Sequence, residues 1–165
     1  MNIDQARQDV QTWIETFVEA PHPALAGWPP CPYARKARLD GTVDIRAGHA
    51  DPYTDLRGVE MTGFEVIAYV YDPEWFDPVE FNHLIDSANE NYLSARDIIA
   101  LADHPEDVES VNGVIMNQGQ WAIAFVQCLS DLNTRAKQLA TKGFYDTWPE
   151  PYLETLFHGR EDPRS

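Results

Sequence analysis

The chain has 165 residues, of which 27 are acidic and 12 are basic, and its formal net charge is −15 at pH 7. Direct binding to nucleic acid or to a membrane surface requires a basic face, so this charge disfavours both. The length suggests one domain, and we predict a single α+β domain over residues 1–159, followed by a mobile polar tail at 160–165.

The cysteine count and the hydropathy pattern favour a cytoplasmic protein. Cys31 and Cys128 are too few and too far apart for a disulfide framework. The sequence does not start with a basic segment and an apolar core, and no apolar run approaches the roughly 20 residues of a membrane span. The chain lacks a glycine-rich phosphate loop, a Cys-x-x-Cys pair and a His-Glu-x-x-His motif, so we expect no cofactor.

The first predicted element is an amphipathic helix. Asn2 can cap it, and Gln5 stands where a capping box places Glu or Gln. Apolar residues then recur at helical spacing, namely Ile3, Ala6, Val10, Trp13, Ile14, Phe17 and Val18. The segment Pro21-His22-Pro23 ends the helix, because proline and the residue before it disfavour helical geometry.

The next stretch, Trp28–Arg38, has the densest set of chemically special residues. Pro32 suits the first position of a helix, which would make Cys31 the N-cap. The positive end of the helix dipole and nearby cations would both favour the thiolate of Cys31. The candidate binding residues around it are Tyr33, Arg35, Lys36 and Arg38. In the alternative interpretation, Cys31 is a small hydrophobic residue packed in a proline-rich loop.

Downstream, apolar runs of strand length and helical spacing predict the remaining elements. Strands are expected at 42–47, 64–72, 97–102 and 120–128. Helices are expected at 78–93, 131–142 and 151–158, and loops at 48–63 and 106–119. The predicted core consists of Trp13, Phe17, Phe64, Val66, Val70, Phe81, Leu84, Ile99, Trp121, Phe125 and Leu139.

The order of these elements predicts a ferredoxin-like sheet, a permuted split βαβ pattern whose last strand has moved to the front. Residues 64–102 form a strand–helix–strand unit, so its two strands should be parallel. The strand and helix at 120–142 begin a second unit, and strand 42–47 takes the place of the missing last strand. We therefore expect a four-stranded, mostly antiparallel sheet with helices on one face, plus N- and C-terminal helices that cover the remaining apolar surface.

The short motifs resemble an uncharacterised bacterial family of unknown function, in which a Cys-Pro-Phe-Ala motif precedes a later His-Pro motif. The matching residues are Trp13, Cys31–Ala34, Gly41–Val43, Phe64–Tyr71 and His104-Pro105. Tyr33 stands where the family has Phe, and the match spans roughly residues 10–107. The resemblance implies no activity, because none is known for the family.

Three classes of function fit these observations. The first, which we expect, is a binding, accessory or regulatory protein whose acidic surface meets a basic protein partner. The second is a thiol-dependent enzyme or redox protein with Cys31 as nucleophile and His104 as base or orienting group. The third is a zinc site of Cys31, His104 and either His22 or His49, whose spacing matches no standard zinc site.

Overall fold

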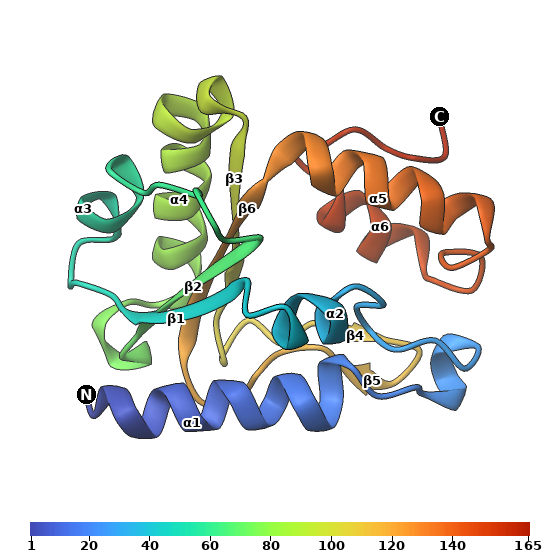
Figure 1. The fold of residues 1–165 in the computed structure, drawn as a ribbon, viewed down its shortest axis with the longest axis horizontal. Helices are drawn as coiled ribbons and strands as arrows, with labels where there is room; N and C mark the ends of the chain where they lie inside the picture. The colour runs from blue at the N-terminus through green and yellow to red at the C-terminus, as the bar shows by residue number, and fades with distance from the viewer.

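A four-stranded mixed sheet lies at the centre of the computed structural model, which describes residues 1–165 (Figure 1). Its strand order is β1-β2-β6-β3. The strands are β1 (Val43–Ala47), β2 (Val66–Tyr71), β3 (Ile98–Asp103) and β6 (Ala122–Cys128). A separate two-stranded hairpin contains β4 (Ser110–Val111) and β5 (Val114–Ile115).

Six α-helices surround the sheet. They are α1 (Ile3–Trp13), α2 (Ala34–Leu39), α3 (Pro52–Arg57), α4 (Pro78–Ala88), α5 (Leu129–Thr141) and α6 (Glu150–Leu156). Helices α1 and α4 each continue into a π-helical turn, at Ile14–Val18 and Asn89–Leu93. The predicted caps are present, since Asn2 Oδ1 accepts a hydrogen bond from Gln5 N and Asp77 Oδ1 accepts one from Glu80 N.

The predicted strand arrangement is confirmed in part. Strands β2 and β3 each pair antiparallel with β6, so they are parallel to one another and separated by β6. Strand β1 lies next to β2 as expected, but it runs parallel to β2, with Val43 opposite Val66. The last strand of a ferredoxin-like sheet would run antiparallel at this place, so the ferredoxin-like topology is not confirmed.

The direction of β1 follows from its connection to β2. Parallel neighbours need a crossover, and α3 lies in the segment that links the two strands. We predicted a loop at 48–63, which missed this helix. Asp51 caps α3 by accepting a hydrogen bond from Tyr53 N, and Pro52 occupies the first turn, so a helix start signal was present.

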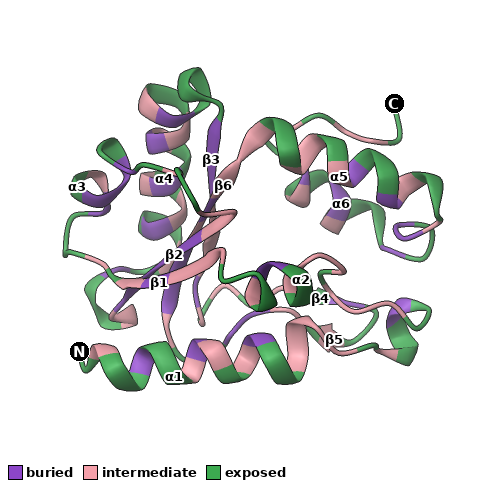
Figure 2. Cartoon of the chain, viewed as in Figure 1, coloured by how far each residue is buried: buried purple, intermediate pink, exposed green.

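Helices cover both faces of the sheet, and the expected N-terminal helix α1 covers apolar surface on the face opposite α4. Ile67, Tyr69 and Tyr71 of β2 belong to the apolar cluster that includes residues of α3 and α4. Ala68 and Val70 belong to a second cluster with α1. Side chains alternate between faces along a strand, so alternate residues of β2 supply the two layers of core. Figure 2 colours most of β2 as buried.

Helix α5 leaves the sheet instead of returning over it (Figure 1). Asp97 holds the point of departure: its backbone oxygen accepts from Leu129 N, and its Oδ1 accepts from Ser130 N at 2.9 Å. With α6, α5 forms what we call the C-terminal lobe, which has an apolar cluster of its own. That cluster consists of Leu25, Val111, Ala136, Leu139, Phe144, Tyr145, Trp148, Leu153 and Phe157.

The predicted core is only partly buried. Val70, Phe81, Ile99 and Leu139 are buried. The other seven predicted core residues are half-buried, namely Trp13, Phe17, Phe64, Val66, Leu84, Trp121 and Phe125. Four of these seven, Trp13, Phe17, Val66 and Phe125, line the cleft described below.

The residues of the predicted tail make contacts with the C-terminal lobe. Arg164 forms ion pairs with Glu150 at 2.6 Å and with Asp162 at 2.7 Å. Glu161 N donates a hydrogen bond to Asn133 Oδ1 of α5. None of the helices combines the length and the apolar character needed to cross a membrane.

Two neighbouring residues of α4 allow a test of the packing. Ile85 is 1% exposed in the core beneath α4, whereas Leu84 is half-buried. We expect Ile85→Ala to lower the free energy of unfolding by about 2–5 kcal/mol, and Leu84→Ala to lower it by less. Urea titrations followed by circular dichroism measure both losses, and a larger loss for Leu84→Ala would mean that the assigned buried face of α4 is wrong.

Candidate functional site

The uncovered part of the sheet forms the floor of a large cleft. Ile99 and Leu101 of β3, Phe125 and Gln127 of β6, and Val66 of β2 all line it. The two residues of β3 are two positions apart, as are the two of β6, and β2 contributes one residue. All of them share one face of the sheet. Helix α1 packs over another part of the same face, and the floor is what α1 leaves open.

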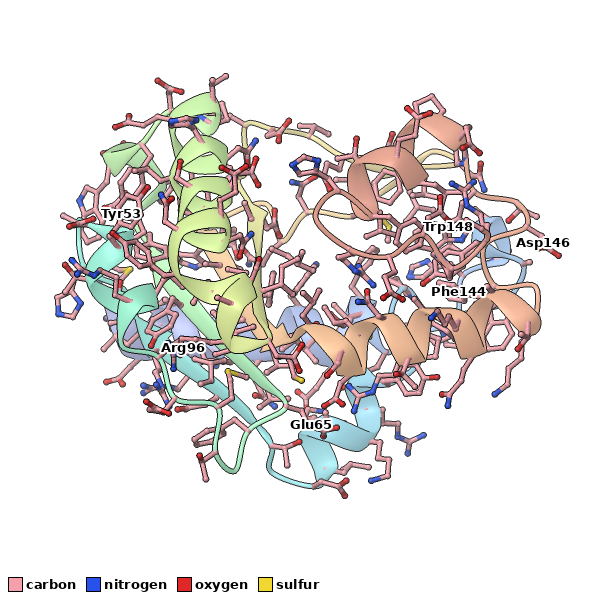
Figure 3. All side chains as sticks on the ribbon, turned by 90° about the horizontal axis from the view of Figure 1, so that it is seen from above. Tyr53, Glu65, Arg96, Phe144, Asp146 and Trp148 are labelled. Atoms are coloured by element: carbon pink, nitrogen blue, oxygen red, sulfur yellow. The ribbon has the colours of Figure 1, made fainter.

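The C-terminal lobe and the end of the first helix form the walls. Trp13 and Phe17 stack on one another with ring centroids 5.9 Å apart, and Trp13 also stacks on Phe125 of the floor. Phe144 and Trp148 line the cleft from the lobe, which stands beside the sheet in Figure 3. The cleft has a volume of about 720 Å³, and 24 of its 39 lining residues are hydrophobic, so it suits a largely apolar occupant.

One end of the cleft carries a group of carboxylates arranged around Asn117. The Nδ2 group of Asn117 donates to Asp103 Oδ1 at 2.9 Å and to the backbone oxygen of Asp107 at 2.9 Å. Its Oδ1 accepts from the backbone N–H of Glu109 at 2.6 Å. Gln118 N donates to the second oxygen of Asp103. Asn117 is 9% exposed, and its hydrogen bonds fix the loop that follows β3.

Glu109 is the titratable group of this cluster that stands out. Burial raises the pKa of Glu109 to about 7, and the charges of Asp107 and Asp103 add to the effect. The nearby hydroxyl of Tyr152, on α6, opposes part of this rise in pKa. Burial also raises the pKa of Asp103. A carboxyl group whose pKa lies near neutrality can exchange a proton with a bound molecule.

Cys31 lies at the rim of the same cleft. Helix α2 begins at Ala34 with Tyr33 at the N-cap position, so Cys31 precedes the helix instead of capping it. The residue is exposed overall, yet protein atoms crowd its thiol, and this burial raises the pKa of Cys31. The N–H groups of Tyr33 and Ala34 and the charge of Arg135 act in the opposite direction without cancelling the rise.

The structure does not bring the predicted basic residues to the thiol. Lys36 pairs with Asp40, and Arg38 pairs with Glu19 at 2.6 Å. Arg35 is exposed and makes no ion pair. Of the four candidate binding residues, only Tyr33 lines the cleft. The cation that lowers the pKa of Cys31 is Arg135 of α5. Its guanidinium lies over the ring of Tyr33 at 5.2 Å.

His104 lies in the core and does not line the cleft. Its Nδ1 accepts a hydrogen bond from Glu106 N, so Nε2 carries the proton and donates to Phe76 O at 3.0 Å. Both ring nitrogens are therefore occupied by the backbone, and the ring packs beside Phe81. The structure does not bring Cys31 and His104 together as a nucleophile and its base.

The histidines considered for zinc have other partners. His22 packs against Phe17, and the Nδ1 atom of His49 contacts Asp55 at 2.5 Å beside α3. Asp55 is buried and also accepts a hydrogen bond from the Tyr71 hydroxyl, so this cluster anchors the turn before α3. No group of three or more His, Cys, Asp or Glu residues is placed to hold a metal ion.

Sequence reasoning missed the carboxylates at the end of the cleft. Asp103, Asp107 and Glu109 follow directly after the buried strand β3, where side chains at a sheet edge collect. That clustering of acids after an apolar run was the available signal. No such local signal pointed to Asn117 and Tyr152. These two residues come close to the carboxylates only because of how the loop and α6 fold.

The raised pKa of Cys31 leads to a chemical test. In a Cys128→Ser background, we expect the pH midpoint of Cys31 alkylation to lie above the free-thiol value of roughly 8.5, because burial disfavours the thiolate. Iodoacetamide kinetics across a pH series measure the midpoint, and the urea-unfolded protein gives the free-thiol reference. A midpoint well below the reference would instead establish a stabilised thiolate.

The raised pKa of Glu109 predicts a dependence of stability on pH. Between roughly pH 4.5 and 7, folded Glu109 keeps its proton while the unfolded chain has released it. This group therefore lowers stability as the pH rises through that window. Glu109→Gln stays neutral, so its stability relative to wild type should increase from about pH 5 to about pH 8. Urea titrations at both pH values measure this change, with exposed Glu154→Gln on α6 as control, and a pH-independent difference contradicts the assignment.

Comparisons with models of known protein families, with curated protein sequences and with solved structures find no match for this chain. The resemblance to the family with Cys-Pro-Phe-Ala and His-Pro motifs therefore stays a prediction. In this fold the two motifs do not share a site, because Cys31 lies at the cleft rim and His104 lies in the core.

Proposed function

We propose that the protein binds a small, largely apolar molecule in the cleft between the sheet and the C-terminal lobe. The observation that carries the proposal is the uncovered apolar floor of the sheet, enclosed by aromatic walls in a cleft of about 720 Å³. This volume lies within the range of roughly 300–1,000 Å³ that is typical of small-molecule sites.

The half-buried aromatic residues support this proposal. Trp13, Phe17 and Phe125 form a stacked series whose rings contact one another but are not covered by a helix. Apolar surface left in contact with water costs roughly 25 cal/mol per Å², so a ligand that covers these rings gains that free energy. Large exposed apolar patches in proteins usually mark a binding site.

A thiol-dependent enzyme is the second candidate, because Cys31 lines the same cleft. The raised pKa of its thiol and the separation of His104 weigh against it. A basic protein partner and a cytoplasmic location both stay predictions. The net charge of −15 supports the first, and the free thiols of Cys31 and Cys128 support the second.

The test of binding uses the neutral dye N-phenylnaphthylamine, whose fluorescence rises in apolar sites. We expect saturable binding to the wild-type protein. Met116 lines the cleft and its neighbour Ile115 is 58% exposed outside it, so Met116→Trp fills the site whereas Ile115→Trp does not. The larger indole would occupy part of the cleft and exclude the dye from it, so Met116→Trp should weaken binding about tenfold or more, a loss of about 1.4 kcal/mol.

Ile115→Trp serves as the matched control and should bind the dye like the wild-type protein. If both variants bind as tightly as wild type, the dye binds elsewhere and the cleft is not the site. Absence of saturable binding to the wild-type protein overturns the proposal directly.

A further inference from the structure

Arg160 differs from the other half-buried arginines of this acidic protein. Arg38, Arg46 and Arg135 each form an ion pair with a carboxylate at 2.7 Å or less. Arg160 is also half-buried, but it makes no ion pair, although the chain has 27 acidic residues. Arg160 lines the cleft beyond the end of α6.

The hydrogen-bonding groups of Arg160 are poorly satisfied. Its Nε is buried without an acceptor, and its only bond is a long one of 3.5 Å from Nη1 to Leu156 O. The cation lies over the ring of Phe157 at 5.2 Å. Burial lowers the pKa of Arg160, which means that its surroundings disfavour the charge. An arginine remains protonated in proteins, so a buried one requires an acceptor to offset this cost.

Two other residues of the lobe that carry hydrogen-bond donors line the same cleft as Arg160. Trp148 is 7% exposed, and its Nε1 is buried without a hydrogen-bond acceptor. Tyr145 lies close enough to Arg160 for the cation to lower its pKa, but burial dominates and raises the pKa of Tyr145 to about 12. Its hydroxyl is therefore a neutral donor at pH 7. Two buried donors without acceptors, on residues that line one cleft, indicate an acceptor that comes from outside the chain.

We propose that Arg160 binds the carboxylate of the cleft's ligand, so that the ligand is an amphiphilic monocarboxylic acid. The apolar part of this ligand would lie over the sheet floor and the aromatic walls, and this inference rests on the proposed function. A single negative charge fits best, because Arg135 is already neutralised by Glu65. A multiply charged group would also meet repulsion from Asp107 in the same cleft.

The experiment compares decanoate with decanol, which has the same chain length and no charge, as competitors of N-phenylnaphthylamine. We expect decanoate to bind the wild-type protein about tenfold more tightly than decanol, since a charge-assisted hydrogen bond is worth that much. Raising the salt concentration should weaken decanoate binding and leave decanol binding unchanged. Equal affinity of the two competitors for the wild-type protein overturns the inference without any variant.

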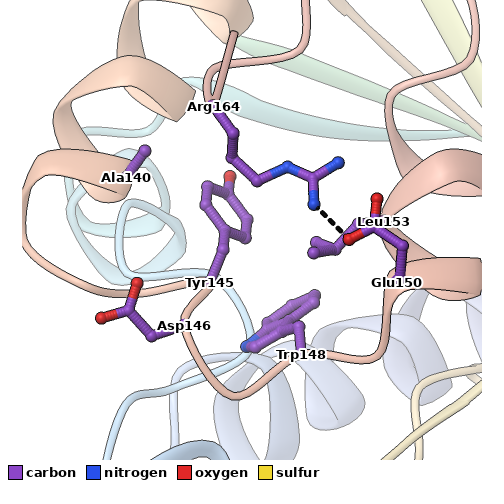
Figure 4. Close-up of a pocket in the computed structure, with 7 residues that line it drawn as sticks. All are labelled: Ala140, Tyr145, Asp146, Trp148, Glu150, Leu153 and Arg164. Carbon is purple, nitrogen blue, oxygen red and sulfur yellow. Dashed lines mark hydrogen bonds and ion pairs between the residues drawn. The ribbon is translucent and has the colours of Figure 1, made fainter.

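Matched arginine variants then locate the charge. Arg160→Gln should abolish the preference for decanoate. Arg164→Gln should keep it, because Arg164 is already paired with Glu150, as Figure 4 shows. A preference that survives in folded Arg160→Gln means that another residue binds the carboxylate, which overturns the assignment.

A third competitor, decyl phosphate, tests the class of anion. Tighter binding of decyl phosphate than of decanoate overturns the monocarboxylate assignment. The proposed function fails separately, because it requires only that the neutral dye bind in the cleft.

Discussion

The junction at Asp97 determines the architecture of this protein. Asp97 has a left-handed backbone conformation, with φ of 57°, and its carboxylate accepts hydrogen bonds from the backbone and side chain of Ser130. These contacts fix the start of α5 and the direction in which it leaves the sheet (Figure 1). Because α5 leaves the sheet, Leu101 and Phe125 stay half-buried and form part of the floor of a cleft.

The polar groups at the cleft fall into two kinds. The carboxylate of Asp103 is held by hydrogen bonds from Asn117 and Gln118, so the protein itself satisfies it. By contrast, the Nε group of Arg160 and the Nε1 group of Trp148 have no acceptor within the chain. A buried polar group that is fully bonded stabilises the local structure, whereas one without a partner indicates a group to be supplied by a ligand. This difference separates structural from binding roles within one cleft.

Local patterns were sufficient to predict most elements. Strands β2, β3 and β6 and helix α4 have apolar runs or helical spacing that depend on neighbours in the sequence. The direction of β1 and the departure of α5 depend on contacts between distant residues, such as Asp97 with Ser130, and spacing alone does not encode them. The aromatic residues predicted as core do pack against other apolar residues, but part of their surface lines a cleft.

The candidate site was predictable only at Cys31 and Tyr33, where prolines and a cysteine are concentrated. The cation that affects the thiol comes from Arg135 of α5, far later in the chain, and not from the basic residues beside it. His104 was selected because of its place after a strand, yet the backbone occupies both of its nitrogens. Residue type indicates what a side chain can do, whereas the fold determines which partners it meets.

The separate apolar cluster of the C-terminal lobe has a consequence for how the molecule opens. The lobe packs around a cluster of nine buried residues, seven of which lie between Ala136 and Phe157, whereas the two clusters on the sheet share the strands between them. Opening the lobe therefore disrupts fewer apolar contacts than unfolding the sheet does, and local opening follows the weakest packed unit. Amide protons of α5 and α6 should exchange with solvent at a lower free energy than those of β2 and β6, and this local opening provides a route into the cleft.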